Sequence, residues 1–206
     1  MANAVDICNM ALANLGDTAD ITSLNPPEGS AQAERCAQFF PVAVNALLEM
    51  HEWNFATRRQ ALTAYSENDR GDWEYKYALP AKLLKVIDIN FEDTFQLPPE
   101  MAKRLYDYEI SVDTKGNKCL YTNIENATIR YVSEVEPVMF PTLFTVALAW
   151  KMSSILAGAL IKGSEGIKMT QSCEQMAMQY LLQAISHDAR QHQEYREQIP
   201  EWIRGR

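Results

Sequence analysis

The chain has 206 residues, 47% of them hydrophobic and 10% aromatic, so it is long enough to bury a core and too apolar to be disordered over most of its length. Its formal net charge of −8 excludes a general electrostatic attraction for nucleic-acid phosphates. The N-terminus lacks a basic region followed by a long apolar run, so we expect no secretory signal peptide.

Two helices are predicted first. Residues 3–15 have an apolar stripe at helical spacing, with Asn3 as N-cap and Gly16 as the residue that ends the helix. A loop rich in proline and glycine separates it from a second helix, predicted over residues 30–51. Pro41 lies inside this helix and removes one backbone hydrogen bond, so a kink is expected in the turn before it.

The middle of the chain changes to the period-two pattern of strands. Residues 53–65 look extended, and the aromatic run 73–80 is interpreted as sheet packing that ends at Pro80. Polar turn residues separate the later segments. We therefore predict one small, mostly antiparallel sheet, with strands at residues 83–91 and 106–112 and a less cleanly alternating strand at 128–135.

The helical period returns after Pro137. One helix is predicted over residues 142–162, a turn over 163–166, and a long helix over 167–195. The first of these is apolar and nearly long enough to cross a membrane. Lys151 at its middle would cost about 2.5–3.5 kcal/mol there, so a buried core helix is predicted instead.

These elements predict an α+β fold. The short turn makes the last two helices antiparallel neighbours, and the simplest packing is a mainly helical four-helix bundle. Residues 1–52 and 138–196 would form the bundle, and residues 53–137 a small antiparallel β module inserted between its halves. Residues 197–206 would form a C-terminal docking tail.

No residue pattern indicates catalysis. His51 and Glu52 begin a zinc-binding HExxH pattern, but Phe55 stands where the second histidine belongs. His187 and His192 are five residues apart, which is poor spacing for a metal, and a solvated polar helix face is the preferred interpretation. No catalytic residue, metal or cofactor is predicted, and the four cysteines are expected to be buried, reduced thiols: Cys8, Cys36, Cys119 and Cys173.

The stretch HEWNFATRR, residues 51–59, joins the second helix to the first strand. Trp53 and Phe55 are expected on one strand face, where they would hold the bundle to the β module. Arg58 and Arg59 would pair with acidic groups of the module or of a neighbouring subunit. The alternative is a small-ligand-binding or enzymatic α+β domain whose cleft uses His51, Glu52, Arg58 and Arg59.

At the C-terminus, IPEWIRGR follows a polar stretch. An aromatic residue flanked by arginines is typical of a docking peptide, and the alternative is a frayed terminus.

Five short motifs occur in order along the chain: ALANLGD (11–17), ITSL (21–24), LLEMHEWNFATRR (47–59), WEYKYALPAKLLKV (73–86) and EWIRGR (201–206). A strand containing Tyr-Val and an apolar helix pair lie between the last two of them. In this order the motifs resemble the tail tubular protein A family of short-tailed phages and prophages, and the resemblance covers nearly the whole chain.

The resemblance implies a head-to-tail connector, also called an adaptor or gatekeeper, that catalyses no reaction. Such proteins form a dodecameric ring between the portal and the tail nozzle of the virion, assembled in the bacterial cytoplasm. The partners would be further copies of this chain, the portal protein and the tail nozzle protein. Genomic DNA would pass through the ring without specific binding, and no membrane contact is expected. A further alternative is that the protein is a helical adaptor of the cell that is not part of a virion. Residues expected to contact the portal or an adjacent subunit are Ile199, Trp202, Ile203, Arg204 and Arg206.

Overall fold

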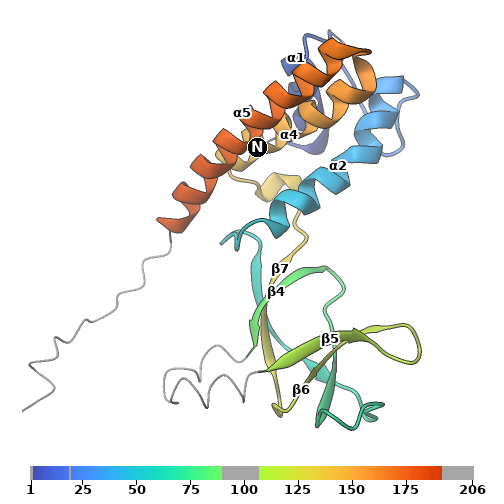
Figure 1. The fold of residues 1–206 in the computed structure, drawn as a ribbon, viewed down its shortest axis with the longest axis vertical. Helices are drawn as coiled ribbons and strands as arrows, with labels where there is room; N and C mark the ends of the chain where they lie inside the picture. The colour runs from blue at the N-terminus through green and yellow to red at the C-terminus, as the bar shows by residue number, and fades with distance from the viewer. Residues whose placement is uncertain (1, 19, 90–106, 192–206) are drawn as a thin grey trace, which may run out of the picture.

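The computed structural model describes residues 2–18, 20–89 and 107–191, and the protein is α+β, with four α-helices and two small antiparallel sheets in this part of the chain. Figure 1 shows the helices gathered at one end of the molecule and the strands at the other. The helices are α1 (Ala4–Asn14), α2 (Ala31–Glu49), α4 (Thr142–Leu160) and α5 (Ser164–Ala189), and a short 3-10 helix, η2 (Pro137–Met139), precedes α4.

The helix starts follow from their caps. The Asn3 side chain accepts a hydrogen bond from the Asp6 backbone N–H, and the Asp6 carboxylate accepts one from the Asn3 N–H, both at 2.9 Å. Ser30 Oγ accepts from the Ala33 N–H at 3.1 Å and starts α2. Gly16 has φ +75° after the end of α1, a conformation that favours glycine. The predicted starts of both helices are confirmed.

Helix α4 is the central helix, because it packs against α1, α2 and α5. Its length and hydropathy would suit a membrane span, but 56% of its apolar window is buried inside the protein, as predicted for a core helix. Its polar residues have partners on the neighbouring helices. Ser153 Oγ donates to the Ala11 carbonyl of α1 at 3.1 Å, and Lys151 pairs with Glu174 of α5 at 2.6 Å.

Helix α5 differs from its predicted range. It begins at Ser164, inside the predicted 163–166 turn, and ends at Ala189 instead of 195. Gly166, in its first turn, is buried against the Ile161 carbonyl, where a Cβ would overlap that oxygen. The turn between α4 and α5 is therefore shorter than predicted, because a glycine without a side chain lets the backbones of the two helices come close together.

The strands form two sheets, where one was predicted. The first has the order β1-β7-β4 and the second β2-β3-β6-β5. β1 and β2 are separated by Leu62 alone, yet they belong to different sheets, so the stretch predicted to be extended, 53–65, changes sheet at Leu62. Their bounds are β1 (Thr57–Ala61), β2 (Thr63–Ala64), β3 (Tyr75–Ala78), β4 (Leu83–Ile89), β5 (Tyr108–Val112), β6 (Lys118–Thr122) and β7 (Thr128–Ser133).

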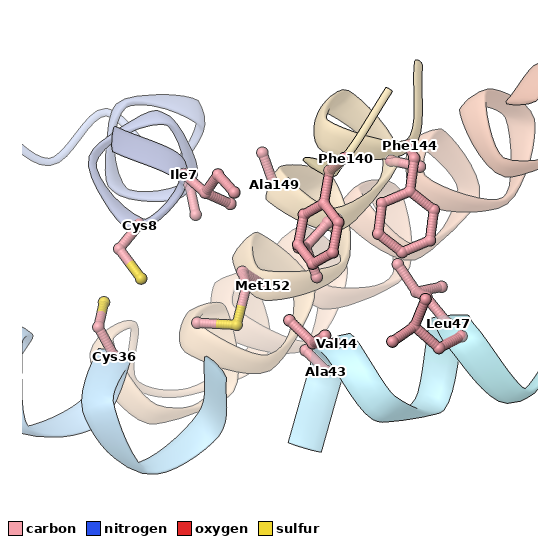
Figure 2. Packing of buried hydrophobic residues seen from close by; sticks show 14 of the residues in the cluster. Ile7, Cys8, Cys36, Ala43, Val44, Leu47, Phe140, Phe144, Ala149 and Met152 are labelled. Carbon is pink, nitrogen blue, oxygen red and sulfur yellow. The ribbon is translucent and has the colours of Figure 1, made fainter. Parts of the chain in front are cut away.

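Two hydrophobic clusters hold these layers together. The larger lies among the helices, where Phe140 and Phe144 lie near Val44 and Leu47 of α2 (Figure 2). The smaller lies between the two sheets. Strand β4 contributes to both, because Leu84 packs against the helical cluster and Val86 against the sheet cluster.

Candidate functional site at the helix–sheet junction

The stretch 51–59 passes from α2 into β1 through a turn. The Trp53 carbonyl accepts hydrogen bonds from the backbone N–H groups of Ala56 and Thr57, at 3.0 and 2.8 Å. Trp53 and Phe55 therefore precede the strand, and their predicted placement on one strand face is wrong. The reason is local, because the backbone closes its own hydrogen bonds in a turn before it extends at Thr57.

Four aromatic rings pack together at this turn: Trp53, Phe55, Phe140 and Phe144, named here the junction aromatic cluster. The Trp53 side chain is only 1% exposed, and its ring meets that of Phe144 edge-on with centroids 5.0 Å apart. The indole Nε1–H donates to the Leu47 carbonyl at 3.0 Å. Trp53 thus fixes the end of α2 against α4.

A buried carboxylate ties α5 to the same turn. Asp188 is 6% exposed and accepts from the Asn54 backbone N–H at 3.2 Å through both oxygens. The Asn54 side chain donates to the Asp188 carbonyl at 2.9 Å, and His51 Nε2 lies 3.2 Å from Asp188 Oδ2. We call Asp188, His51 and Asn54 the Asp188 latch. It joins the C-terminal end of α5 to the chain that leaves α2.

The interpretation of this helix end as a solvated polar face holds for His187, which is exposed, but is wrong for Asp188, which is buried; His192 lies outside the described residues. Asp188 lies on the buried side of α5, where it continues a stripe of buried residues spaced three or four positions apart. The spacing of Asp188 from the apolar residues of α5 was the sequence signal that could have predicted its burial. The stripe is Cys173, Ala177, Leu181, Ala184 and Asp188.

Arg58 and Arg59 are both exposed on β1 and point to opposite faces of the sheet, since successive strand residues alternate. Arg59 stands opposite Arg130 of β7. It lines a cavity of about 580 Å³ together with His51 and Glu52, whereas Arg58 is not part of that lining. Three of the four residues of the alternative ligand cleft are therefore brought together.

The cavity has mixed charge, and several of its polar groups, among them His51 and Glu52, make contacts within the protein. Lys85 and Arg130 add positive charge from β4 and β7, and Glu52 lies 3.7 Å from Arg130. Within the described ranges, no group of three or more His, Cys, Asp or Glu side chains could hold a metal ion. The arrangement suits a small polar or anionic ligand better than proton transfer, because His51 is engaged with Asp188.

A second polar network lies in the four-stranded sheet and was not predicted. Lys76 of β3 is buried and pairs with Asp69 at 3.0 Å and Asp113 at 3.2 Å; these three residues are the Lys76 cluster. The hydrogen bond from Lys76 lowers the pKa of Asp69 to about 2. The Asn117 backbone N–H holds the pKa of Asp113 below its usual range. The cluster joins two loops to the sheet.

The predicted tail contacts Ile199, Trp202, Ile203, Arg204 and Arg206 lie outside the described residues. All four cysteines are buried and free, as predicted. No protein-family model matches the chain, and no curated protein matches it.

Proposed function

We propose that this protein is a structural virion component: a connector subunit that forms a ring between the portal and the tail nozzle and continues the DNA channel. The proposal starts from the resemblance to the tail tubular protein A family. The observation that carries it is the structural role of residues 51–59, one of the three most specific motifs of the resemblance. His51, Trp53 and Asn54 contact α2, α4 and α5, so their chemistry positions the elements of the fold.

In this proposal the four helices act as one bundle around α4, and residues 53–137 are an inserted β module. The contacts of α4 with α1, α2 and α5 support the bundle. The Asp188 latch supports a fixed connection between bundle and module, because it links α5 to the turn before β1. A ring subunit needs such a connection, since each subunit must present both ends at a constant angle.

Helix α5 offers a surface for contact between subunits. Ile167 and Leu182 are 64% and 60% exposed, and Met178 is also exposed. The spacings of 11 and 15 residues from Ile167 place all three on one helix face. An exposed apolar stripe of this kind is typical of a protein–protein contact, and a head-to-tail contact between identical subunits closes into a ring when the rotation permits.

The net charge of −8 supports a channel that DNA crosses without specific binding, because acidic walls repel phosphates. Arg204 and Arg206 of the tail would instead pair with carboxylates of the portal, next to the apolar anchors Trp202 and Ile203.

The test is to mix the protein with its portal and measure the mass of the product by light scattering and native mass spectrometry. We expect a complex that carries a ring of subunits, visible by negative-stain microscopy on the portal. A protein that stays at its monomer mass of 23.4 kDa with portal present would contradict the proposal.

Two variants locate the contacts. Replacing both Ile167 and Leu182 by Glu should prevent ring closure, whereas Val42→Glu, at a position 62% exposed on α2, is the matched control. Deleting residues 199–206 should abolish capture by the portal. Undiminished capture by the truncated protein would remove the tail from the proposal.

A second candidate function, a small-ligand-binding domain, is favoured by the 580 Å³ cavity beside His51, Glu52 and Arg59. A thermal-shift screen of small polar and anionic compounds tests it. A stabilising compound whose effect disappears in Arg59→Ala, but persists in Arg58→Ala, would support this candidate over the connector. If no compound stabilises the protein in this way, the cavity is only a space left between the helices and the sheet, and the ligand-binding candidate is rejected.

A further inference from the structure

Two of the four cysteines face each other in the helical core. Cys8 lies on α1 and Cys36 on α2, and both side chains are 0% exposed. Figure 2 shows their sulfur atoms pointing toward one another across the space between the two helices. The other two, Cys119 on β6 and Cys173 on α5, lie in different elements.

The two facing thiols are chemically unequal. The hydrogen bond with Cys36, and then burial, hold the pKa of Cys8 above its usual range. The same hydrogen bond lowers the pKa of Cys36, although burial opposes this. Cys36 is therefore the thiol that more readily becomes a thiolate, and Cys8 is the one that keeps its proton.

We propose that Cys8 and Cys36 are a redox-active pair that closes into a reversible disulfide and locks α1 onto α2. The lock matters because α1 packs mainly on α4 and makes little direct contact with α2. A covalent link would restrict the unfolded chain between residues 8 and 36 and join the N-terminal helix to its neighbour.

The oxidant is a small-molecule disulfide such as oxidised glutathione. The Cys36 thiolate attacks one of its sulfurs, the S–S bond breaks, and one glutathione thiolate leaves. Cys8 then loses its proton, and its thiolate attacks the Cys36 sulfur and expels the second glutathione thiolate. The two protons of the protein thiols end on the two released glutathiones. The protein pair is oxidised by two electrons, and the reagent is reduced by two.

Because both sulfurs are buried, the reagent enters only when α1 opens locally. Helix α1 packs mainly on α4, so its local opening breaks few contacts with the other elements. Oxidation should therefore be slow in the folded protein and faster in mild denaturant.

The test uses the full chain with Cys119 and Cys173 replaced by Ser, so that the pair alone remains, beside the wild type. After incubation with oxidised glutathione, intact mass should show the loss of two hydrogens in a monomer, and peptide mapping should link residue 8 to residue 36. The thermal midpoint should rise, and a reductant should reverse both changes. The Cys8→Ser variant should instead keep a glutathione adduct on Cys36.

Four outcomes would overturn the proposal. They are full retention of both thiols under conditions that oxidise the urea-unfolded chain, a link between other cysteines, a dimer joined through these residues, or a thermal midpoint that does not rise. If the Cys8→Ser variant fails to fold, peptide mapping of the oxidised wild-type protein by itself shows whether residue 8 is linked to residue 36.

Discussion

Replacing Trp53 by Ala tests how much the junction aromatic cluster contributes to stability. A buried indole removes roughly 200 Å² from water, which at about 25 cal/mol per Å² is up to about 5 kcal/mol. Truncation also leaves the Leu47 carbonyl without its Nε1–H donor, at a cost of about 1 kcal/mol. Since the surrounding rings can collapse partly into the space, we expect the free energy of unfolding to fall by about 4 kcal/mol.

The assay is urea denaturation followed by far-ultraviolet circular dichroism, which does not depend on the lost fluorophore. Trp53→Phe keeps a ring against Phe144 but removes the donor, so its loss should be about 1–2 kcal/mol. Met50→Ala, at an exposed position at the end of α2, should change the free energy of unfolding by less than about 0.5 kcal/mol. If Trp53→Ala loses no more than Met50→Ala, Trp53 does not hold the helices together as argued.

Three further predictions concern buried polar and backbone positions. Asp188→Ala should lower the free energy of unfolding by about 2 kcal/mol in urea melts, because the donors of the latch lose their acceptor, and Asp188→Asn should lose less. The pKa of Asp69 is lowered in the folded state, so its ionised carboxylate stabilises the folded protein fully above pH 4, and this contribution is lost as the pH falls toward 2. Thermal midpoints measured across this pH range should therefore fall less steeply in Lys76→Met than in the wild type. Gly166→Ala should cost about 1–3 kcal/mol because its Cβ would overlap a backbone oxygen of the preceding turn, whereas Gly158→Ala, with its nearest neighbour at 3.7 Å, should be neutral or stabilising in the same melts.

The helix starts were predictable because their signals are local. Asn3 and Ser30 cap α1 and α2 through side chains that reach only three residues ahead. The central role of α4 was predictable from its composition, since an apolar helix with few charges must be covered on most sides. These features depend on neighbours in the sequence or on overall hydropathy, and neither requires knowledge of which distant segment comes near.

The two sheets and the latch were not predictable for the opposite reason. Alternation identified most strands, but it carries no information on which strand pairs with which, so β1 and β2 looked like one extended segment. Asp188 lies 134 residues from its partner Asn54, and its burial depends on that contact. A carboxylate on an apolar helix stripe is the pattern that should have prompted a search for a distant donor.

The polar contacts between distant segments share one property: each joins elements that hydrophobic packing alone would leave free to slide. Burial of apolar surface is not directional, whereas a hydrogen bond fixes distance and angle. Ser153 fixes α4 against α1, the Asp188 latch fixes α5 against the turn before β1, and Lys76 fixes two loops against the four-stranded sheet. A subunit that must repeat one geometry around a closed ring requires this kind of registration, because a small angular error in each copy accumulates around the circle. In the proposed connector ring, loss of Asp188 should therefore impair ring closure more than it impairs folding. Comparing the urea midpoint of Asp188→Ala with the mass of the complex that it forms with the proposed portal partner separates the two effects.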